Sequence, residues 1–469
     1  MRLYDSRSQQ LVDFVPVTPG RVGMYVCGPT VQSSPHIGHL RSALVYDLWH
    51  RWLSYRGFDV TLVRNVTDID DKVLQSAKGS DEQWWARAYR VELEFSAAYA
   101  RLGIRSPTYE PRATASIPQM LELIGELVGR GHAYPATDGS ADVYFDTGSW
   151  APYGELTHQR PDDMADSADS DPRGKRNARD FALWKGAKES EPASASWKSP
   201  WGPGRPGWHI ECSAMAARYL GERFDIHGGG RDLRFPHHEN ELAQSAAAGH
   251  GFADNWVHNG LVTVEGQKMS KSLGNSVFAA DLLDRARPLV VRYYLGAAHY
   301  RSTIDYHDGS LTEAEAALER IEGFLRRVDR RLAGTRFESV AATALPPEFA
   351  EAMDDDLAIP QALAVVHERV RAGNQALDSE VLETAASLRG EVIAMTDVLG
   401  INPLGEEWTD AGDTRISGAL DSLVATLIAH RSEARSSRDF ARADRIRAEL
   451  SSAGIQLEDT PSGPEWRLE

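Results

Sequence analysis

Two short motifs place histidines and lysines where they could serve phosphate chemistry. The first, His36-Ile37-Gly38-His39, follows an apolar run and opens a segment with helical spacing. Imidazoles at a helix N-terminus, with a glycine that admits a nucleotide close to the backbone, can stabilise charge on the α-phosphate of ATP. The second, Lys268-Met269-Ser270-Lys271-Ser272, carries two lysines that could close over pyrophosphate. Taken alone, the histidines of the first motif could merely cap a helix, and the lysines of the second could lie in a solvated loop. The presence of both motifs in one chain favours nucleotide chemistry.

A second set of residues is of the types that ligate metals. His237 and Glu241 stand four apart in a segment predicted to be helical, so they share one face. The only two cysteines, Cys27 and Cys212, could complete a tetrahedral zinc site of two thiolates, one imidazole and one carboxylate. The alternative is that both cysteines are small buried hydrophobic residues. We expect each in a loop-like, polar context beside another motif, which favours the metal site.

The elements that must position these residues follow from the hydrophobic pattern. Met24-Tyr25-Val26 predicts a buried strand, residues 40–57 have helical spacing, and FDVTLVRNV predicts another strand. This is a β-loop-α-β unit of an α/β fold with a parallel, Rossmann-like sheet, which binds ligands beyond the carboxyl ends of its strands. The alternation resumes at GWHIEC, so a subdomain is inserted, with 159–180 expected as a mobile surface loop. After about 310 the pattern is helical, and the tail predicts a hairpin around Pro461-Ser462-Gly463.

Composition excludes several classes of protein. The chain has 469 residues, 42% hydrophobic and 25% charged, and no stretch approaches the roughly 18 apolar residues of a membrane helix. The start, MRLYDSRSQQ, lacks the apolar region of a signal peptide, so we expect a cytoplasmic protein, in which a disulfide is disfavoured. The net charge of −17 argues against non-specific DNA binding. Six arginines between 431 and 447 nevertheless predict a basic helix, for which ion pairs with Glu433, Asp439 and Asp444 are the alternative explanation.

The motifs together carry a resemblance that extends along nearly the whole chain. The paired nucleotide motifs resemble those of class I aminoacyl-tRNA synthetases. The chain is similar to the cysteinyl-tRNA synthetase family in CGPTVQSSPHIGHLRS, RNVTDIDDK, GWHIECSAM, FDIHGGGRDLRFPHHENELAQS, KMSKSLGN, RDFARADRIRAEL and GIQLEDTPSGPEWR. The resemblance implies activation of L-cysteine by ATP with Mg²⁺, transfer of cysteine to tRNA(Cys), and a monomer. One Zn²⁺ per chain would be held by Cys27, Cys212, His237 and Glu241 and would bind the substrate thiol.

The resemblance also implies roles for single residues. Thr67, Trp208 and His227 would line the cysteine pocket, and Asp232 would bind the substrate ammonium. The catalytic residues would be His36, His39, Lys268 and Lys271, with Gly38 and Lys271 at ATP. Anticodon contacts would come from Arg435, Asp444, Arg447 and Asp459. This chain departs from the family pattern at Gln32-Ser33-Ser34, where Tyr-Asp-Tyr is common, and at Phe440, where tryptophan is common.

The implied organisation is a Rossmann-like class I catalytic domain with an inserted connective subdomain, an α-helical bundle and a small α+β tail domain. The expected boundaries are 1–114 and 205–260 for the two catalytic halves, 115–204 for the insertion, 261–310 for the KMSKS-loop stem-contact region, 311–405 for the bundle and 406–469 for the anticodon-binding domain.

Two other functions compete with this one. A related ligase joins cysteine to an amino sugar inositol in mycothiol synthesis, but it lacks the segment after about residue 400, which this chain has. A non-catalytic paralogue that only binds tRNA or nucleotide is disfavoured because both nucleotide motifs and the whole set of metal ligands are intact.

Overall fold

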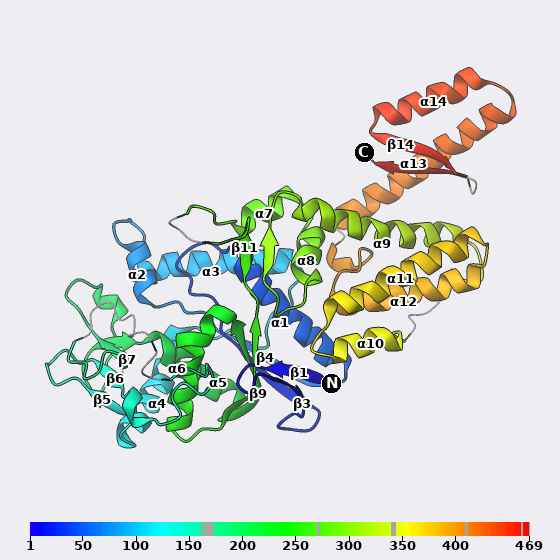
Figure 1. The fold of residues 1–469 in the computed structure, drawn as a ribbon. Coiled ribbons are helices and arrows are strands. Elements are labelled where there is room, and N and C mark those ends of the chain that lie inside the picture. The colour runs from blue at the N-terminus through cyan, green and yellow to red at the C-terminus, as the bar shows by residue number, and fades with distance from the viewer. Residues whose placement is uncertain are drawn as a thin grey trace. The chain divides into compact units, whose positions relative to one another are not determined.

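A computed structural model describes residues 1–160, 164, 173–269, 273–338, 344–408, 411–460 and 463–468. The chain divides into two units, Met1–Pro403 and Leu404–Glu469 (Figure 1). Each unit has a hydrophobic core of its own.

The centre of the first unit is a four-stranded parallel sheet with strand order β10-β9-β3-β4. Its strands are β3 (Arg21–Val26), β4 (Asp59–Arg64), β9 (Arg223–Gly230) and β10 (Phe252–Asn259). In the register Met24 stands opposite Ile226, and both side chains are buried, as in a sheet covered on both faces. Neighbouring strands β3 and β9 come from distant parts of the sequence, which confirms a Rossmann-like sheet interrupted by an insertion.

A hairpin and a series of helices accompany this sheet. Helix α1 connects β3 to β4, which confirms the predicted β-loop-α-β unit. The hairpin pairs β1 (Arg2–Asp5) with β2 (Gln10–Asp13). The helices are α1 (Ile37–Tyr55), α2 (Asp71–Ala77), α3 (Trp84–Arg101), α4 (Ile117–Gly129), α5 (Trp208–Leu220) and α6 (Glu239–Ala247).

The insertion contributes an antiparallel sheet with the order β5-β6-β7-β8. These strands are β5 (Ala133–Pro135), β6 (Val143–Phe145), β7 (Phe181–Gly186) and β8 (Gly204–Pro206). Of the loop expected at 159–180, residues 161–163 and 165–172 lie outside the described residues. In its later part Arg173 donates to Asp142 at 2.8 Å and to the Gly186 carbonyl at 2.7 Å, which places this part against the sheet.

The rest of the first unit is a small sheet followed by helices. The sheet has the order β12-β11-β13, from β11 (Val262–Val264), β12 (Gln267–Lys268) and β13 (Ile304–Tyr306). The helices are α7 (Ala279–Arg285), α8 (Pro288–Ala297), α9 (Ser310–Leu332), α10 (Pro347–Asp354), α11 (Ile359–Asp378) and α12 (Leu382–Leu399). In α9 the buried Leu318, Ile321 and Leu325 have the predicted spacing of a bundle helix. Within the described ranges, no helix combines the length and the apolar content needed to cross a membrane.

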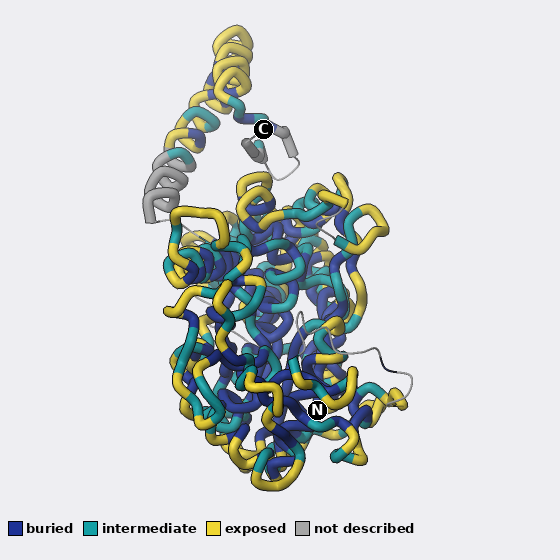
Figure 2. Tube along the Cα trace, turned by 90° about the vertical axis from the view of Figure 1, so that its left-hand side faces the viewer, coloured by how far each residue is buried: buried dark blue, intermediate teal, exposed yellow. Residues whose placement is uncertain are grey.

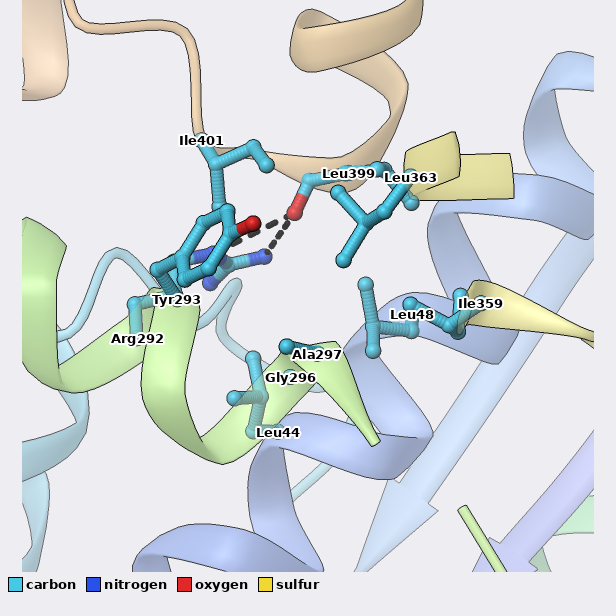
Figure 3. A pocket seen from close by; sticks show the side chains of 10 residues that line it. All are labelled: Leu44, Leu48, Arg292, Tyr293, Gly296, Ala297, Ile359, Leu363, Leu399 and Ile401. Carbon is cyan, nitrogen blue, oxygen red and sulfur yellow. Dashed lines mark hydrogen bonds between the residues drawn. The ribbon is translucent and has the colours of Figure 1, made fainter. Parts of the chain in front are cut away.

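A buried ion pair joins α1 to α8 and to the end of α12. Arg292 donates to Asp47 at 2.6 Å and to the Leu399 carbonyl at 2.9 Å, and both charged side chains are almost fully buried. Figure 3 shows Arg292 reaching this carbonyl beside a small pocket that is lined mainly by aliphatic side chains. The bundle is therefore fastened directly to the helix that begins at the first nucleotide motif.

The second unit packs two helices against a hairpin. Its elements are α13 (Ala411–Ser436), α14 (Phe440–Ser452), β14 (Ile455–Thr460) and β15 (Gly463–Leu468), and the two strands pair antiparallel as predicted. The single basic helix expected over 431–447 is wrong: the chain turns after Ser436, and the Asp439 carboxylate caps α14 by accepting from Arg442 N. Figure 2 shows that the residues around this turn are mostly exposed.

Candidate metal and nucleotide site

The four expected metal ligands come together beyond the carboxyl end of β3. Cys27 directly follows this strand, Cys212 lies in α5, His237 lies in the short turn Arg234–His238, and Glu241 lies in α6. All four are buried, and one potential ligand atom from each lies within 4.8 Å of the others. Two local expectations are corrected: Cys212 is in a helix rather than a loop, and His237 precedes the helix that it was expected to open.

The separations of the donor atoms suit a tetrahedral ion. The two Sγ atoms are 3.7 Å apart, Cys27 Sγ is 3.3 Å from Glu241 Oε1, and His237 Nε2 is 3.1 Å from the same oxygen. Donors bound at about 2.0–2.3 Å to one tetrahedral zinc lie about 3.3–3.8 Å from each other. Burial raises the pKa of both thiols. A divalent cation among these donors would offset that cost and hold the sulfurs as thiolates.

Further histidines orient the two non-sulfur ligands. His209 Nδ1 lies 2.9 Å from His237 Nδ1, which leaves His237 Nε2 directed at the cluster. His227 Nε2 lies 2.8 Å from Glu241 Oε2 and is fully buried. A second group of four potential ligands, Cys27, His227, His238 and Glu241, overlaps the first. Sequence reasoning missed His209, although it lies inside the GWHIEC block, because one histidine beside a tryptophan has no distinctive spacing.

The other expected pocket residues have different surroundings, and among them Trp208 contacts a residue of this cluster. Trp208 is half-buried and stacks on His237, with ring centroids 4.1 Å apart. Thr67 is buried and donates from Oγ1 to Glu211 Oε2 at 2.8 Å, and burial raises the pKa of that glutamate well above its usual value. Asp232 is exposed at the end of β9, where its charge acts on His36 and favours protonation of that imidazole.

The first nucleotide motif caps α1 in a way that fixes its tautomers. His36 Nδ1 accepts from Gly38 N, and His39 Nδ1 accepts from His36 N, each at 3.2 Å. Burial lowers the pKa of His36, and lowers the pKa of His39 to about 3. Both imidazoles are therefore neutral at pH 7 with the proton on Nε2, so each has an N–H that can be donated to phosphate oxygens.

The start of the second motif and the segment that follows it lie against the first motif. Segment 277–279 follows the lysine motif and pairs with the residues around His36, through Ile37 N to Val277 O and Ala279 N to Pro35 O, both at 2.9 Å. A Cβ added at Gly38 would lie 3.1 Å from His36 Cε1, a tight contact, and 3.4 Å from Met269 Cε, an ordinary one, so the glycine mainly leaves room for the imidazole of its own motif. Lys268 is exposed at the end of β12, whereas Lys271 lies outside the described residues.

The expected anticodon residues belong to the second unit. Arg435 lies in the last turn of α13, Asp444 and Arg447 lie on α14, and all three are exposed. Asp459 is in β14, and its side chain lies outside the described part of the structure.

Comparison with known proteins agrees with this arrangement. The family model of the tRNA synthetases class I (C) catalytic domain matches residues 13–316, that of the DALR domain matches 348–403, and that of the cysteinyl-tRNA ligase anticodon binding domain matches 417–467. Cysteine–tRNA ligases from Leifsonia xyli and Clavibacter sepedonicus are 69% and 68% identical, over 100% of this chain and 99% of each relative. The fold is similar to Mycobacterium tuberculosis methionyl-tRNA synthetase in complex with methionyl-adenylate, with a TM-score of 0.60, 17% identity, and coverage of 82% of this chain and 90% of that one. The chain therefore belongs to the cysteine–tRNA ligase family of class I aminoacyl-tRNA synthetases.

Proposed function

We propose that this enzyme joins L-cysteine to ATP, forming cysteinyl-adenylate and pyrophosphate, and then passes the cysteinyl group to tRNA(Cys) with release of AMP. The observation that carries the proposal is a buried cluster of thiol, imidazole and carboxyl side chains in the same unit as the first nucleotide motif, against which the segment that follows the second motif lies. The identity to cysteine–tRNA ligases over the whole chain and the match to the anticodon binding domain support the tRNA step. We also expect a cytoplasmic protein and, on the resemblance alone, a monomer.

We assign the metal as one Zn²⁺ per chain, held by Cys27, Cys212, His237 and Glu241, and expect Mg²⁺ to accompany ATP. Zinc bound there would supply a thiophilic Lewis acid that takes a thiol as thiolate and discriminates against the hydroxyl of serine. The half-buried Trp208 ring stacked on His237 gives the site an apolar wall that restricts the approach of water. Thr67, His227 and Asp232 complete the proposed pocket, with Asp232 at the substrate ammonium.

Activation is an attack by the cysteine carboxylate on the α-phosphorus of ATP. The new bond joins a carboxylate oxygen to phosphorus, and the bond from the α-phosphorus to the bridging oxygen breaks, so that pyrophosphate leaves with the electron pair. The Nε2 protons of His36 and His39 are the donors for charge that develops on the α-phosphate. Lys268 and Lys271 are assigned to the pyrophosphate, and Gly38 to the close approach of the nucleotide.

The second unit favours tRNA over an amino sugar as the acceptor of cysteine. A ligase for a small acceptor needs no anticodon reader, yet this chain has a separate unit, Leu404–Glu469, whose residues 417–467 match an anticodon binding domain. Arg435, Asp444, Arg447 and Asp459 are the residues that we assign to the anticodon.

Cysteine-dependent ATP–pyrophosphate exchange, with serine as competitor, followed by charging of total tRNA, tests this function. We expect exchange with cysteine, little exchange with serine, and charging of one tRNA species. The double variant His36→Ala/His39→Ala is the control for exchange that does not come from this site. Pyrophosphate exchange without tRNA charging, together with transfer of cysteine to an amino sugar inositol, would establish the competing function instead.

A further inference from the structure

Glu239 lies between two of the assigned metal ligands but faces away from the metal cluster. Its side chain is buried, with 1% of the residue surface exposed. The carboxylate accepts three hydrogen bonds from a segment about 80 residues earlier: Gly154 N at 2.9 Å, Thr157 N at 2.9 Å and Thr157 Oγ1 at 2.8 Å. A buried carboxylate with three donors makes strong, charge-assisted contacts. Glu239 therefore anchors this segment firmly, although it has no place in the chemistry described so far.

The anchored segment, residues 153–157, contacts the metal-bearing turn at more than one point, and we call it the strap. Tyr153 donates from its hydroxyl to Asn240 Oδ1 at 2.5 Å. Arg234, three residues before His237, donates to the Leu156 carbonyl at 2.6 Å. The strap comes from the inserted part of the chain, after β6, whereas the turn follows β9. Contacts before the first ligand and between the two ligands thus join the insertion to the metal-bearing turn.

We propose that Glu239 is a positioning residue of the metal centre, which holds His237 and Glu241 at ligand separation by fastening their turn to the strap. Glu239 is two residues from each ligand, which places it about 200° round a helical turn, on the opposite side. Contacts on that side set the rotation of the turn about its axis, and rotation would carry both ligands away from the two thiolates. The insertion is thereby part of the metal site without supplying a ligand. This inference rests on the proposed zinc-dependent function.

Zinc affinity of the full-length enzyme, measured by competition with a chromogenic chelator, tests the proposal. Glu239→Gln keeps the shape of the side chain but turns an N–H donor toward a backbone N–H of the strap. We expect Zn²⁺ affinity to fall about tenfold, as for other residues that support metal ligands. In pyrophosphate exchange the KM for cysteine should rise while the KM for ATP stays the same, a difference that general destabilisation would not produce.

Two further variants make the result specific. Thr157→Val removes only one of the three donors, and we expect a loss of zinc affinity of about three- to fivefold. Glu155→Gln is the matched control, because Glu155 lies in the same strap but pairs with Arg7 instead, so its zinc affinity should equal that of the wild type. If Glu239→Gln does not fold, Thr157→Val decides the question.

The contrary result is equally clear. A lower melting temperature with unchanged zinc affinity in Glu239→Gln and Thr157→Val would show that the strap only stabilises the fold, and would overturn the proposal. The zinc content of the wild-type enzyme is measured first, before any variant is compared. If the wild-type enzyme binds no stoichiometric zinc, the proposed zinc-dependent function is refuted instead.

Discussion

The chemistry of single residues in this site depends on which nitrogen of each imidazole is already engaged. Nδ1 of both His36 and His39 accepts a backbone N–H, and Nδ1 of His237 lies against His209. In each case Nε2 is left for the substrate or the metal. Phosphate binding and metal binding need different protonation of Nε2. A phosphate oxygen needs an N–H donor, whereas a metal ion needs the lone pair of an unprotonated nitrogen. The local contacts therefore separate the histidines by role, although all three are neutral at pH 7.

Loss of one thiolate should remove the metal. In Cys212→Ala, three donors remain, and the buried Cys27 and Glu241 lose the tetrahedral arrangement that offsets their desolvation. We expect zinc affinity to fall at least about a hundredfold and the KM for cysteine to rise strongly. Metal analysis after dialysis, alongside the wild type, measures the first effect. Stoichiometric zinc together with normal affinity for cysteine would show that Cys212 is not a ligand.

The lysine motif should act mainly in the transition state, because charge on the pyrophosphate grows as the bond to the α-phosphorus breaks. We expect Lys271→Ala to lower kcat in pyrophosphate exchange about a hundredfold or more, with a smaller rise in the KM for ATP. Lys198→Ala, at an exposed lysine of the insertion, should leave both constants unchanged. An effect confined to KM would make the motif a simple nucleotide clamp.

Residue types and spacing pointed to the four residues that form the buried cluster, but not to their surroundings. His237 and Glu241 could be paired because a separation of four places two side chains on one face. His209 and His258 could not be found this way. His258 lies in β10, 2.8 Å from His238, and only the packing of β10 beside β9 brings these histidines together. The partners of Glu239 in the strap have no signal in the sequence.

Among the elements, a charged contact fastens the insertion to the loop after β4. Asp71, at the start of α2, bonds to Lys185 of β7 at 2.8 Å and to the buried Arg205 of β8. Burial alone would raise the pKa of Asp71, but Lys185 and Arg205 together lower it to about 2. This loop also carries Thr67, so the contact connects the insertion to the proposed cysteine pocket.

We expect Asp71→Asn to lower the free energy of unfolding by about 1 kcal/mol at pH 7, a value reduced for solvent screening because a third of the Asp71 side chain is exposed. The folded-state pKa lies below the unfolded value of about 4. The contribution of the charge is therefore present above pH 4 and is lost as the pH falls from about 4 to 2. Urea unfolding of wild type and variant at pH 7, 5 and 3 measures this difference.

Asp59→Asn is the matched control. Asp59 is exposed, and its nearest ion-pair partner, Arg21, is as far as 4.0 Å away, so the pair is weak. The substitution should change stability little at any pH. A difference between Asp71→Asn and the wild type that is the same at all three pH values would contradict an electrostatic origin for the contact.

Hydrophobic periodicity predicted whether most elements are helices or strands. The prediction of one helix over 431–447 failed because a helix cap interrupts this run. The strand that ends at Val26 and the tail hairpin were predicted correctly, because their hydrophobic patterns agree with the pairing that these strands make in the fold. The run from 431 to 447 has helical composition throughout, so composition alone does not reveal a break. The break comes from backbone chemistry, because Arg438 adopts a φ of +62° and Asp439 caps the next helix. Five of the six arginines consequently lie on two successive helices, and Arg438 lies in the turn between them.

At the scale of the whole molecule, the assigned chemistry and the assigned tRNA recognition lie in different units. The nucleotide motifs and the metal cluster belong to Met1–Pro403, whereas Arg435 and Arg447 belong to Leu404–Glu469. The core of the second unit, which includes Val424 and Leu450, is formed by its own residues. Substitution of an exposed arginine there should therefore leave the geometry of cysteine activation intact.

We accordingly expect Arg447→Ala to retain nearly full cysteine-dependent pyrophosphate exchange while charging of tRNA(Cys) falls. The loss in tRNA binding should be about 1–3 kcal/mol if the arginine reads a base edge. In that case the loss of binding free energy caused by Arg447→Ala should be smaller for transcripts with an altered anticodon, because those transcripts already lack the contact between the arginine and the base. A phosphate contact would instead weaken all transcripts alike and reduce the salt dependence of binding. Arg326→Ala, on the exposed face of α9, is the control. Equal loss of exchange and charging in Arg447→Ala would contradict the separation of the two activities, because a surface residue of the second unit would then be needed for chemistry in the first.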